Sequence, residues 1–475
     1  MEARPVVEPE VLASLPASVM ALLAWQAEEI RRLSAKVDEL MARVVELEGT
    51  RGKDSTNSSK PPSTEHPHAK PKSDKPKSPL KRGAQPGHDK HERKLIPTEE
   101  CQEVVTCIPT ACRRCGGALQ GVDPQPLRQQ VGEIPEIRLI VTEYQRHRLT
   151  CACGCTTCGP LPPGVPDGQA GPRLVALTAL LMANYRQSKR RTAEFLTQLL
   201  NRPASPGWIV KLQERAAEAV APAYAEMAAL LPKQDVLAID ESPTKQANAK
   251  AWVWTFVAQT FTFFACRTSR AAEVLKQLLG QPFDGKVHCD RAKMYWCLGR
   301  LQWCWAHLKR DFQALIDSAC HTKRRLGRDL MEPTLEMFGL WKKVRDGTLE
   351  RKEFGELMKP IRARVGRLLL RGYCNPKTRR WCAELVQHQD RLWTFVDCDG
   401  VEPTNNAAER ALRHAVIWRK LSFGTQSESG SRFVERMLTV VETCRRQKTN
   451  AYAWLTRAVH AHFSGQKCPS LITGA

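Results

Sequence analysis

Apolar residues recur at a seven-residue period near the N-terminus and predict a long amphipathic helix over residues 20–48. Branched residues at the a positions, with leucine at most d positions, favour a parallel two-stranded coiled coil. The repeat runs through Leu23, Gln26, Ile30, Leu33, Val37, Leu40, Val44 and Leu47. A helix packed on its own domain would give the same pattern. We favour the coiled coil because the tract that follows offers no core to pack on.

Between Gly49 and about Thr98 the periodic pattern is lost, and proline, serine, lysine and histidine dominate. Such a segment buries too little apolar area to offset the entropy of ordering it, so we predict a disordered basic linker. Nine lysines and arginines lie between residues 70 and 94. They would either add salt-sensitive contacts to phosphates or solvate the linker.

Two cysteine groups bracket a strand-like stretch at residues 136–150. They are Cys112 and Cys115 before it, and Cys151, Cys153, Cys155 and Cys158 after it. Four thiolates on two turns match a tetrahedral structural zinc site, which would anchor a small domain with little core. The favoured ligands are Cys112, Cys115, Cys151 and Cys153. Cys155 and Cys158 are the rival second pair, and unligated thiols are the plain alternative.

Residues 171–231 carry apolar positions at helical spacing and are interrupted by a proline-containing turn at 203–207. The pattern predicts helices on both sides of the turn, the later one from about Trp208. Such helices form either a helix-turn-helix reader of DNA or ordinary helical packing.

From Asp235 the pattern changes to short runs of β-branched and aromatic residues. Residues 235–240, 251–259 and 260–267 predict three consecutive antiparallel strands. A helix at 269–279, strands at 285–290 and 301–307 and a helix at 308–316 are expected to follow. This order is that of a ribonuclease H-like sheet, in which the first and fourth strands are neighbours. The predicted fold class is therefore α/β.

Three acidic residues, Asp240, Asp290 and Glu409, lie at the ends of different predicted elements. Pairing of the first and fourth strands would place Asp240 beside Asp290, and a helix from about Asn406 brings in Glu409. Converging carboxylates can hold two Mg²⁺ ions, which would stabilise the attacking and leaving oxygens of a phosphoryl displacement. Taken alone, Glu409 also suits a capping box with Asn406 or an ion pair with Arg413.

Two neighbouring features complete the predicted core. Glu241 follows Asp240 in the same strand and is expected to point to the opposite side. Residues 318–398 are helical in pattern and basic, with 17 Lys and Arg against 7 acids between Ser318 and Cys382. They predict an insertion that either clamps DNA or exposes a solvated face.

Composition narrows the possible partners. Lys and Arg outnumber Asp and Glu by 72 to 50, a formal charge of +22, which favours polyanions or acidic membranes. No run approaches the roughly 18 apolar residues of a membrane span, and the N-terminus lacks a secretory pattern. We expect a soluble cytoplasmic protein whose other cysteines are mostly reduced core thiols.

Taken together, these motifs resemble bacterial transposases of the insertion-sequence sixty-six type, a branch of the DDE transposase superfamily. The resemblance covers nearly the whole chain. Besides the heptads and cysteine groups it rests on NSSKPP (57–62), GAQPGH (83–88), QSKRR (187–191), IDESPTK (239–245), CDRAKMY (289–295), CWAHLKRDF (304–312) and TNNAAERALR (404–413). The family more often has glycine where Ala84 stands and threonine where Ser242 stands.

The resemblance implies that Asp240, Asp290 and Glu409 are catalytic acids that bind Mg²⁺. Cys304 and His307 fill a C-x-x-H signature that follows the second aspartate in related transposases. His307 would orient a phosphate or the strand end, or it is a satisfied histidine at a strand-to-helix junction. Four basic residues near the third acid would grip DNA phosphates: Arg410, Arg413, Arg419 and Lys420.

The implied mechanism is cleavage at the element end by activated water, followed by attack of the freed 3′-hydroxyl on target DNA. The implied partners are double-stranded DNA, a second copy of the chain held through the coiled coil, and accessory transposition proteins. A zinc-containing, coiled-coil DNA-binding regulator without catalysis is the main rival. A stand-alone metal nuclease would cut DNA and never join its ends.

The predicted architecture is a ribonuclease H-like core with a helical insertion, preceded by a coiled coil, a linker and a small zinc-binding domain. The predicted domains are the coiled coil (1–48), the disordered basic linker (49–99), the zinc-binding domain (100–168), a helical DNA-binding region (169–232), the first part of the core (233–317), the helical insertion (318–398), the last core helix with the third acid (399–446) and a C-terminal segment (447–475).

Overall fold

The computed structural model describes residues 14–50, with 42–50 as backbone only, residues 57 and 58, and residues 94–472. Most of the predicted linker, with the motif at 83–88, lies outside these ranges. The described chain divides into two compact units. One contains residues 163–188 and 210–472 together with the N-terminal residues, and the other contains residues 189–209 with the described part of 68–162. No helix in the described ranges is long and apolar enough to cross a membrane.

The predicted N-terminal helix is confirmed as α2 (Ala17–Thr50). Its heptad side chains are solvated: Ile30 is 64% exposed, Leu33 51% and Leu40 54%. The described part of the chain therefore leaves this apolar stripe uncovered.

In the second unit, a short hairpin joins β1 (Arg148–Thr150) to β2 (Thr156–Cys158), with Leu149 opposite Thr157. The strand predicted at 136–150 is wrong except for its last three residues, because residues 136–147 form neither helix nor strand. Ile140 there is 97% exposed. Strand propensity needs a pairing partner and a face to bury, and this stretch has neither among the described residues.

The larger unit is built on a five-stranded mixed sheet in the order β5-β4-β3-β6-β7. β3 pairs antiparallel with β4 and parallel with β6, β4 pairs antiparallel with β5, and β6 pairs parallel with β7. The three predicted antiparallel strands and the adjacency of the first and fourth strands are confirmed. The bounds are β3 (Val236–Gln246), β4 (Ala249–Val257), β5 (Thr262–Arg267), β6 (Lys286–Cys289) and β7 (Arg300–Trp303).

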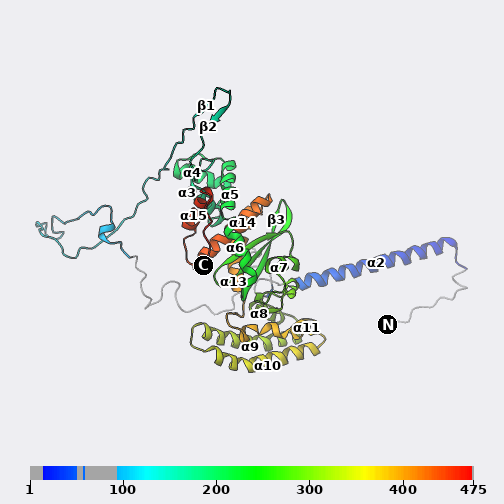
Figure 1. Cartoon of the computed structure of the whole chain (residues 1–475). Coiled ribbons are helices and arrows are strands. Elements are labelled where there is room, and N and C mark those ends of the chain that lie inside the picture. Colours follow the sequence, from blue (N-terminus) through cyan, green and yellow to red (C-terminus); the bar gives the residue numbers. More distant parts are fainter. Residues whose placement is uncertain (1–13, 51–56, 59–93, 473–475) are drawn as a thin grey trace. The chain divides into compact units, whose positions relative to one another are not determined.

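Helices surround this sheet (Figure 1). α13 (Asn406–Ser422) packs on β3 and β4, α14 (Glu428–Arg446) packs on β5, and α15 (Ala451–Phe463) packs on α3 (Pro172–Ala183). The helical stretch predicted from residue 171 breaks at 184–188, where Arg186 has a positive φ of 59°. Along the sequence, three further helices precede β3: α4 (Lys189–Leu200), α5 (Pro206–Ala219) and α6 (Ala221–Leu230). One helix, α7 (Ala272–Leu279), follows β5.

Side chains of α14 close the outer edge of β5. Three alternate N–H groups of the strand each donate to a side chain of the helix: Thr262 to Thr443 Oγ1 at 3.1 Å, Phe264 to Thr439 Oγ1 at 3.0 Å, and Cys266 to Glu435 Oε2 at 2.7 Å. Alternate strand residues repeat every ~6.7 Å and helical residues four apart every ~6 Å, so the two spacings match. An edge that would otherwise recruit another strand is thus satisfied within the fold.

The stretch predicted to be a helical insertion is helical. After α8 (Trp305–Ile316) the chain forms α9 (His321–Arg345), α10 (Arg351–Cys374), α11 (Arg379–Gln387) and α12 (Thr394–Asp397). α9 and α10, yellow in Figure 1, lie side by side. α9 approaches α8 at Gly327, where a Cβ would lie 2.8 Å from the carbonyl oxygen of Phe312. This close approach fixes the insertion against the core.

The edge contacts of α14 yield the first prediction. Thr439→Val keeps the side-chain volume but leaves the buried N–H of Phe264 without its acceptor, which costs about 1–3 kcal/mol. We expect a lower unfolding midpoint and faster hydrogen exchange at the Phe264 amide. Thr456→Val is the matched control, because in the described residues Thr456 Oγ1 bonds within its own helix alone, to Tyr452 O at 2.9 Å. Equal exchange rates at Phe264 in the two variants would contradict the interpretation.

Candidate active site

The pairing register of β3 and β6 brings Asp240 and Asp290 to the same level of the sheet, although β3 continues to Gln246 and does not end at Asp240 as the sequence predicted. The paired residues are Val236 with Lys286, Leu237 with Val287 and Ala238 with His288. Each aspartate lies two residues beyond the last of these pairs. Because the strands run parallel over these pairs, Asp240, which lies inside the longer β3, and Asp290, which directly follows β6, are at the same level of the two strands. The adjacency of β3 and β6 thus places Asp240 and Asp290 on neighbouring strands, as the sequence predicted.

Asp240 lies in a cluster of carboxylates. Burial, together with the charges of Glu241, Asp290 and Glu409, raises the pKa of Asp240 well above its usual range. One of its oxygens, Oδ1, accepts the backbone N–H of Glu241 at 2.9 Å, and Asp290 Oδ1 accepts that of Ala292 at 2.8 Å. Since the charges of Asp290 and Glu409 both reach Asp240, the fold brings the three acids within electrostatic range.

The segment before α13 attaches the third acid to the sheet. Asn405 donates from Nδ2 to the carbonyl oxygen of Ile239 at 2.7 Å, and its backbone N–H reaches Cys304 Sγ at 3.2 Å. The backbone N–H of Glu409 in turn donates to the carbonyl oxygen of Asn405 at 3.1 Å. One asparagine therefore joins the strand of Asp240, the junction before α8 and the helix of Glu409.

Glu409 faces α8. Its Oε1 lies 3.7 Å from His307 Nδ1 and 3.9 Å from Arg310 Nη2. The alternatives drawn from the sequence are wrong: Asn405, not Asn406, caps α13, its side chain makes no capping bond, and the described ion pairs of Glu409 do not include Arg413. Asn405 Nδ2 donates to Ile239, while Asn405 Oδ1, the atom that would accept a capping bond, has no hydrogen-bond partner among the described residues.

His307, Cys304 and Glu409 form a group of possible metal ligands, with ligand atoms within 4.8 Å of one another. Burial raises the pKa of Cys304 to about 11, so its thiol stays neutral. Burial and the nearby Arg310 and Arg291 lower the pKa of His307 to about 4, so its imidazole is neutral too. Among the described residues His307 Nδ1 and Glu409 Oε1 are buried without a hydrogen-bond partner. Glu409 therefore supplies the charge of this group.

Glu241 belongs to a network that the sequence did not reveal. Its carboxylate accepts the hydroxyl of Tyr295 and, at 2.8 Å, Nε of Arg270, and its charge also reaches Asp240. The Arg270 guanidinium lies 5.0 Å from the ring centroid of Trp252. Burial raises the pKa of Glu241 to about 7 against the effect of the Tyr295 hydrogen bond. Because Tyr295 follows closely after Asp290, the network ties the segment carrying Asp290 to β3.

The basic residues near the third acid differ in their surroundings. Arg410, Arg413 and Lys420 are exposed. Arg419 is half-buried and donates to the carbonyl oxygen of Pro243 and, at 3.3 Å, to Ser242 Oγ. Arg419 thus holds α13 on β3, a role that the expectation of phosphate binding did not include.

The cysteine groups form two tight turns. Gly116 donates to the carbonyl oxygen of Cys112 and Gly154 to that of Cys151, both at 2.8 Å and both with positive φ. Hydrogen bonds from the backbone at Cys115 lower the pKa of Cys112, and those from the backbone at Cys153 lower the pKa of Cys151. In the described ranges these sulfurs are not gathered into one metal-sized group. The zinc site therefore stays a prediction.

Comparison with known families gives two matches. The profile described as Transposase IS66 family matches residues 167–432, and one described as a family of unknown function matches residues 15–94. The first match contains the five strands, the insertion and all three acids.

Two curated proteins of Sinorhizobium fredii are also similar to the chain. "Uncharacterized protein y4hP" is 24% identical over 398 residues, which are 75% of this chain and 71% of the relative. "Uncharacterized protein y4qI" is 24% identical over 246 residues, 46% of this chain and 45% of the relative. These names assign no activity. Since the first profile spans more than half of the chain and includes the elements that carry Asp240, Asp290 and Glu409, the chain belongs to the IS66 family of transposases.

Proposed function

We propose that this transposase is a DDE enzyme that cuts DNA at insertion-sequence ends and joins the freed 3′ ends to target DNA. The observation that carries the proposal is that the charges of Asp290 and Glu409 both reach Asp240, with the aspartates on paired strands and Glu409 on a helix that Asn405 ties to β3. The metal-sized group among the described residues joins Glu409 to Cys304 and His307, so closure of all three acids around ions is part of the proposal. The order β5-β4-β3-β6-β7, with β4 antiparallel to its neighbours, supports a ribonuclease H-like core.

Two Mg²⁺ ions are the cofactor that we assign to the three acids. Carboxylate oxygens are the hard ligands that Mg²⁺ prefers. Among the described residues Asp240 and Asp290 have no ion pair, whereas Glu241, Asp311 and Glu409 each lie beside an arginine. The two aspartates therefore lack a protein cation as ion-pair partner, which leaves their oxygens available to added cations. When bound, the ions would stabilise the attacking and leaving oxygens of phosphoryl transfer.

Side chains beside the acids would hold the DNA. Neutral His307 can offer a hydrogen bond without adding charge, and Arg310 supplies positive charge beside Glu409. We assign to both the orientation of the phosphate that is cut. Exposed Arg410, Arg413 and Lys420 would contact neighbouring phosphates, which position DNA without reading its sequence.

A second copy of the chain is the partner that we assign to α2. Its exposed apolar stripe with branched a positions and leucines at d suits a parallel coiled coil. Pairing two DNA ends requires two active sites, which such a dimer would supply. Accessory transposition proteins remain part of the proposal on the strength of the family resemblance.

A DNA-binding regulator without catalysis would use the same zipper, cysteine turns and positive charge. It would give no role to a cluster of carboxylates in which burial, and then the charges of the neighbouring acids, disfavour ionisation of Asp240. The transposase proposal accounts for that cluster, and a single substitution separates the two.

Asp240→Ala should abolish cleavage and strand transfer while leaving DNA affinity unchanged. Losing an outer-shell partner of a metal ligand already costs about 10–100-fold, so losing the ligand itself should exceed that range. The measurement uses the full chain, Mg²⁺ and DNA ends taken from the repeats that flank the gene. Asp284→Ala, an exposed acid in the same unit, is the matched control. Strand transfer at the wild-type rate by the Asp240 variant would refute the proposal.

Tyr295→Phe tests whether the Glu241 network positions Asp290. Removing the hydroxyl frees one Glu241 oxygen, so we expect half-maximal strand transfer to need roughly tenfold more Mg²⁺. Tyr452→Phe is the control, because the Tyr452 hydroxyl contacts only the carbonyl oxygen of Arg173, at 3.3 Å, in the described structure. A loss of activity with an unchanged Mg²⁺ midpoint would show that Tyr295 serves stability alone.

Zinc content tests the cysteine turns. We expect one Zn²⁺ per purified chain, lost in Cys112→Ser and Cys153→Ser and retained in Cys158→Ser, because the favoured site uses both turns. Metal analysis after dialysis against metal-free buffer is the measurement, with exposed Cys297→Ser as the control. Zinc lost from the Cys158 variant but kept by the Cys153 variant would select the rival pair, and zinc absent from the wild type would end the proposal.

A further inference from the structure

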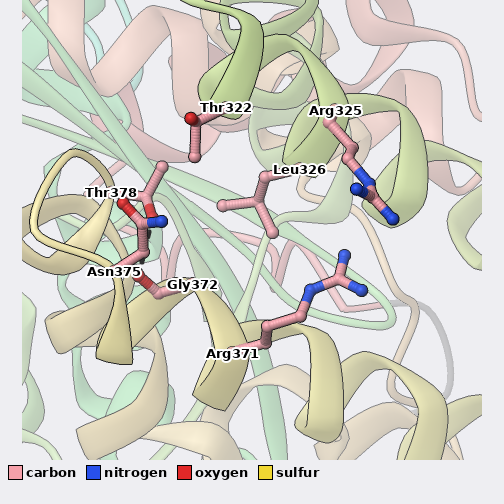
Figure 2. Close-up of a pocket in the computed structure, with 7 residues that line it drawn as sticks. All are labelled: Thr322, Arg325, Leu326, Arg371, Gly372, Asn375 and Thr378. Atoms are coloured by element: carbon pink, nitrogen blue, oxygen red, sulfur yellow. Dashed lines mark hydrogen bonds between the residues drawn. The ribbon is translucent and has the colours of Figure 1, made fainter.

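A cavity of about 220 Å³ lies in the helical insertion, away from the three acids in sequence. It is lined by the first turns of α9, the last turn of α10 and the turn that leads to α11. The polar side chains that line it are Thr322, Arg325, Arg371, Asn375 and Thr378. Figure 2 shows the guanidinium groups of Arg325 and Arg371 turned toward each other on one side, with Leu326 between them and the hydroxyl and amide groups.

The charge of this cavity is incompletely balanced. Arg371 pairs with Asp329, whereas Arg325 has no ion pair among the described residues. The first two turns of α9, residues 321–328, also contain Lys323, Arg324 and Arg328 and no acid. Both lining arginines are exposed, so a ligand can reach them. Asp329 compensates one of the two guanidinium charges, so the pair of arginines keeps a net positive charge that favours a further anion.

The backbone that carries the two arginines is held firmly. Gly372 is buried, and a Cβ there would lie 2.5 Å from Cys382 Sγ and 2.9 Å from Leu326 Cδ2, so α10 contacts both α9 and α11 at this point. The Thr378 hydroxyl donates to the carbonyl oxygen of Gly372 at 2.6 Å. Arg371, one residue before Gly372, and Arg325, one residue before Leu326, are therefore presented from packed helices rather than from a loop.

We propose that this cavity binds a phosphate group of the DNA backbone. Guanidinium groups match phosphate oxygens with paired N–H donors, and the amide and hydroxyl groups of Asn375 and Thr322 offer further donors. The cavity is small, polar at its rim and apolar at Leu326, which suits one phosphate rather than a base read by its edge. The inference rests on the proposed function, because it gives the basic insertion a defined DNA contact.

The test measures binding of full-length chain to double-stranded DNA without Mg²⁺ over a range of salt concentrations. We expect Arg325→Ala and Arg371→Ala each to weaken binding roughly tenfold and to reduce the slope of log affinity against log salt by about 1. Arg345→Ala is the matched control: it removes the same charge from an exposed position of α9 about 30 Å along the helix. Losses no greater than that of the Arg345 variant would overturn the proposal.

A variant that is expected to strengthen DNA binding distinguishes a lost DNA contact from damage to the fold. Asp329→Asn releases Arg371 from its carboxylate partner and should tighten DNA binding about two- to threefold, whereas damage to the helices would weaken it. Looser binding by this variant would overturn the proposal. The proposal would also be overturned if the cavity bound free phosphate alone. In that case the arginine variants would lose binding of inorganic phosphate while their affinity for DNA stayed unchanged. These readouts need no catalysis, so they fail independently of the Asp240 test.

Discussion

The geometry of the acid cluster depends on the hydrogen bonds of one residue, Asn405. Its side chain is almost completely buried and spans from α13 to the carbonyl oxygen of Ile239, one residue before Asp240. Its backbone serves both Cys304 and Glu409. Acids from distant parts of the chain can lie near one another only if the strands and helices that carry them keep a fixed separation. A hydrogen bond from a buried amide fixes that separation more precisely than apolar contacts do. Register positions the two aspartates, and Asn405 ties the helix of the third acid to the strand that carries Asp240.

The same junction explains how the core accepts a long insertion. The chain leaves the sheet at α8 and returns at Pro403, whose carbonyl oxygen accepts the N–H of Trp305 at 2.9 Å. The two ends of the inserted segment therefore lie together in the core. Buried aromatic contacts then attach the inserted helices; for example, the ring centroids of Trp305 and Trp393 lie 4.9 Å apart. Loop length adds little to the closure entropy once the ends are held, so helices carrying their own core fit there without distorting the acids.

Local pattern made much of this fold predictable. The strands and the helices of the insertion follow from periods of two and 3.6 residues, and analogy with the ribonuclease H-like order of elements predicted that the first and fourth strands, and with them Asp240 and Asp290, are neighbours. What the sequence did not reveal depends on long-range partners. The strand expected at residues 136–147 lacks a partner among the described residues. The bond from Asn405 Nδ2 to Ile239 joins residues 166 positions apart, so no local pattern indicates it. Likewise, nothing local identifies Arg270 and Tyr295 as partners of Glu241.

The distribution of arginines concentrates the negative charge of the site. Arg270 lies on Glu241, Arg310 beside Glu409, and Arg291 on Asp311, so the outer carboxylates are each compensated. In the described structure Asp240 and Asp290 are not, and burial with neighbouring charge makes ionisation of Asp240 costlier in the fold than in the unfolded chain. Such an arrangement lowers the stability of the metal-free fold. The proposed cations would reverse that effect, because a ligand that binds only the folded state stabilises it. Local destabilisation and affinity for the cofactor would then have a single cause.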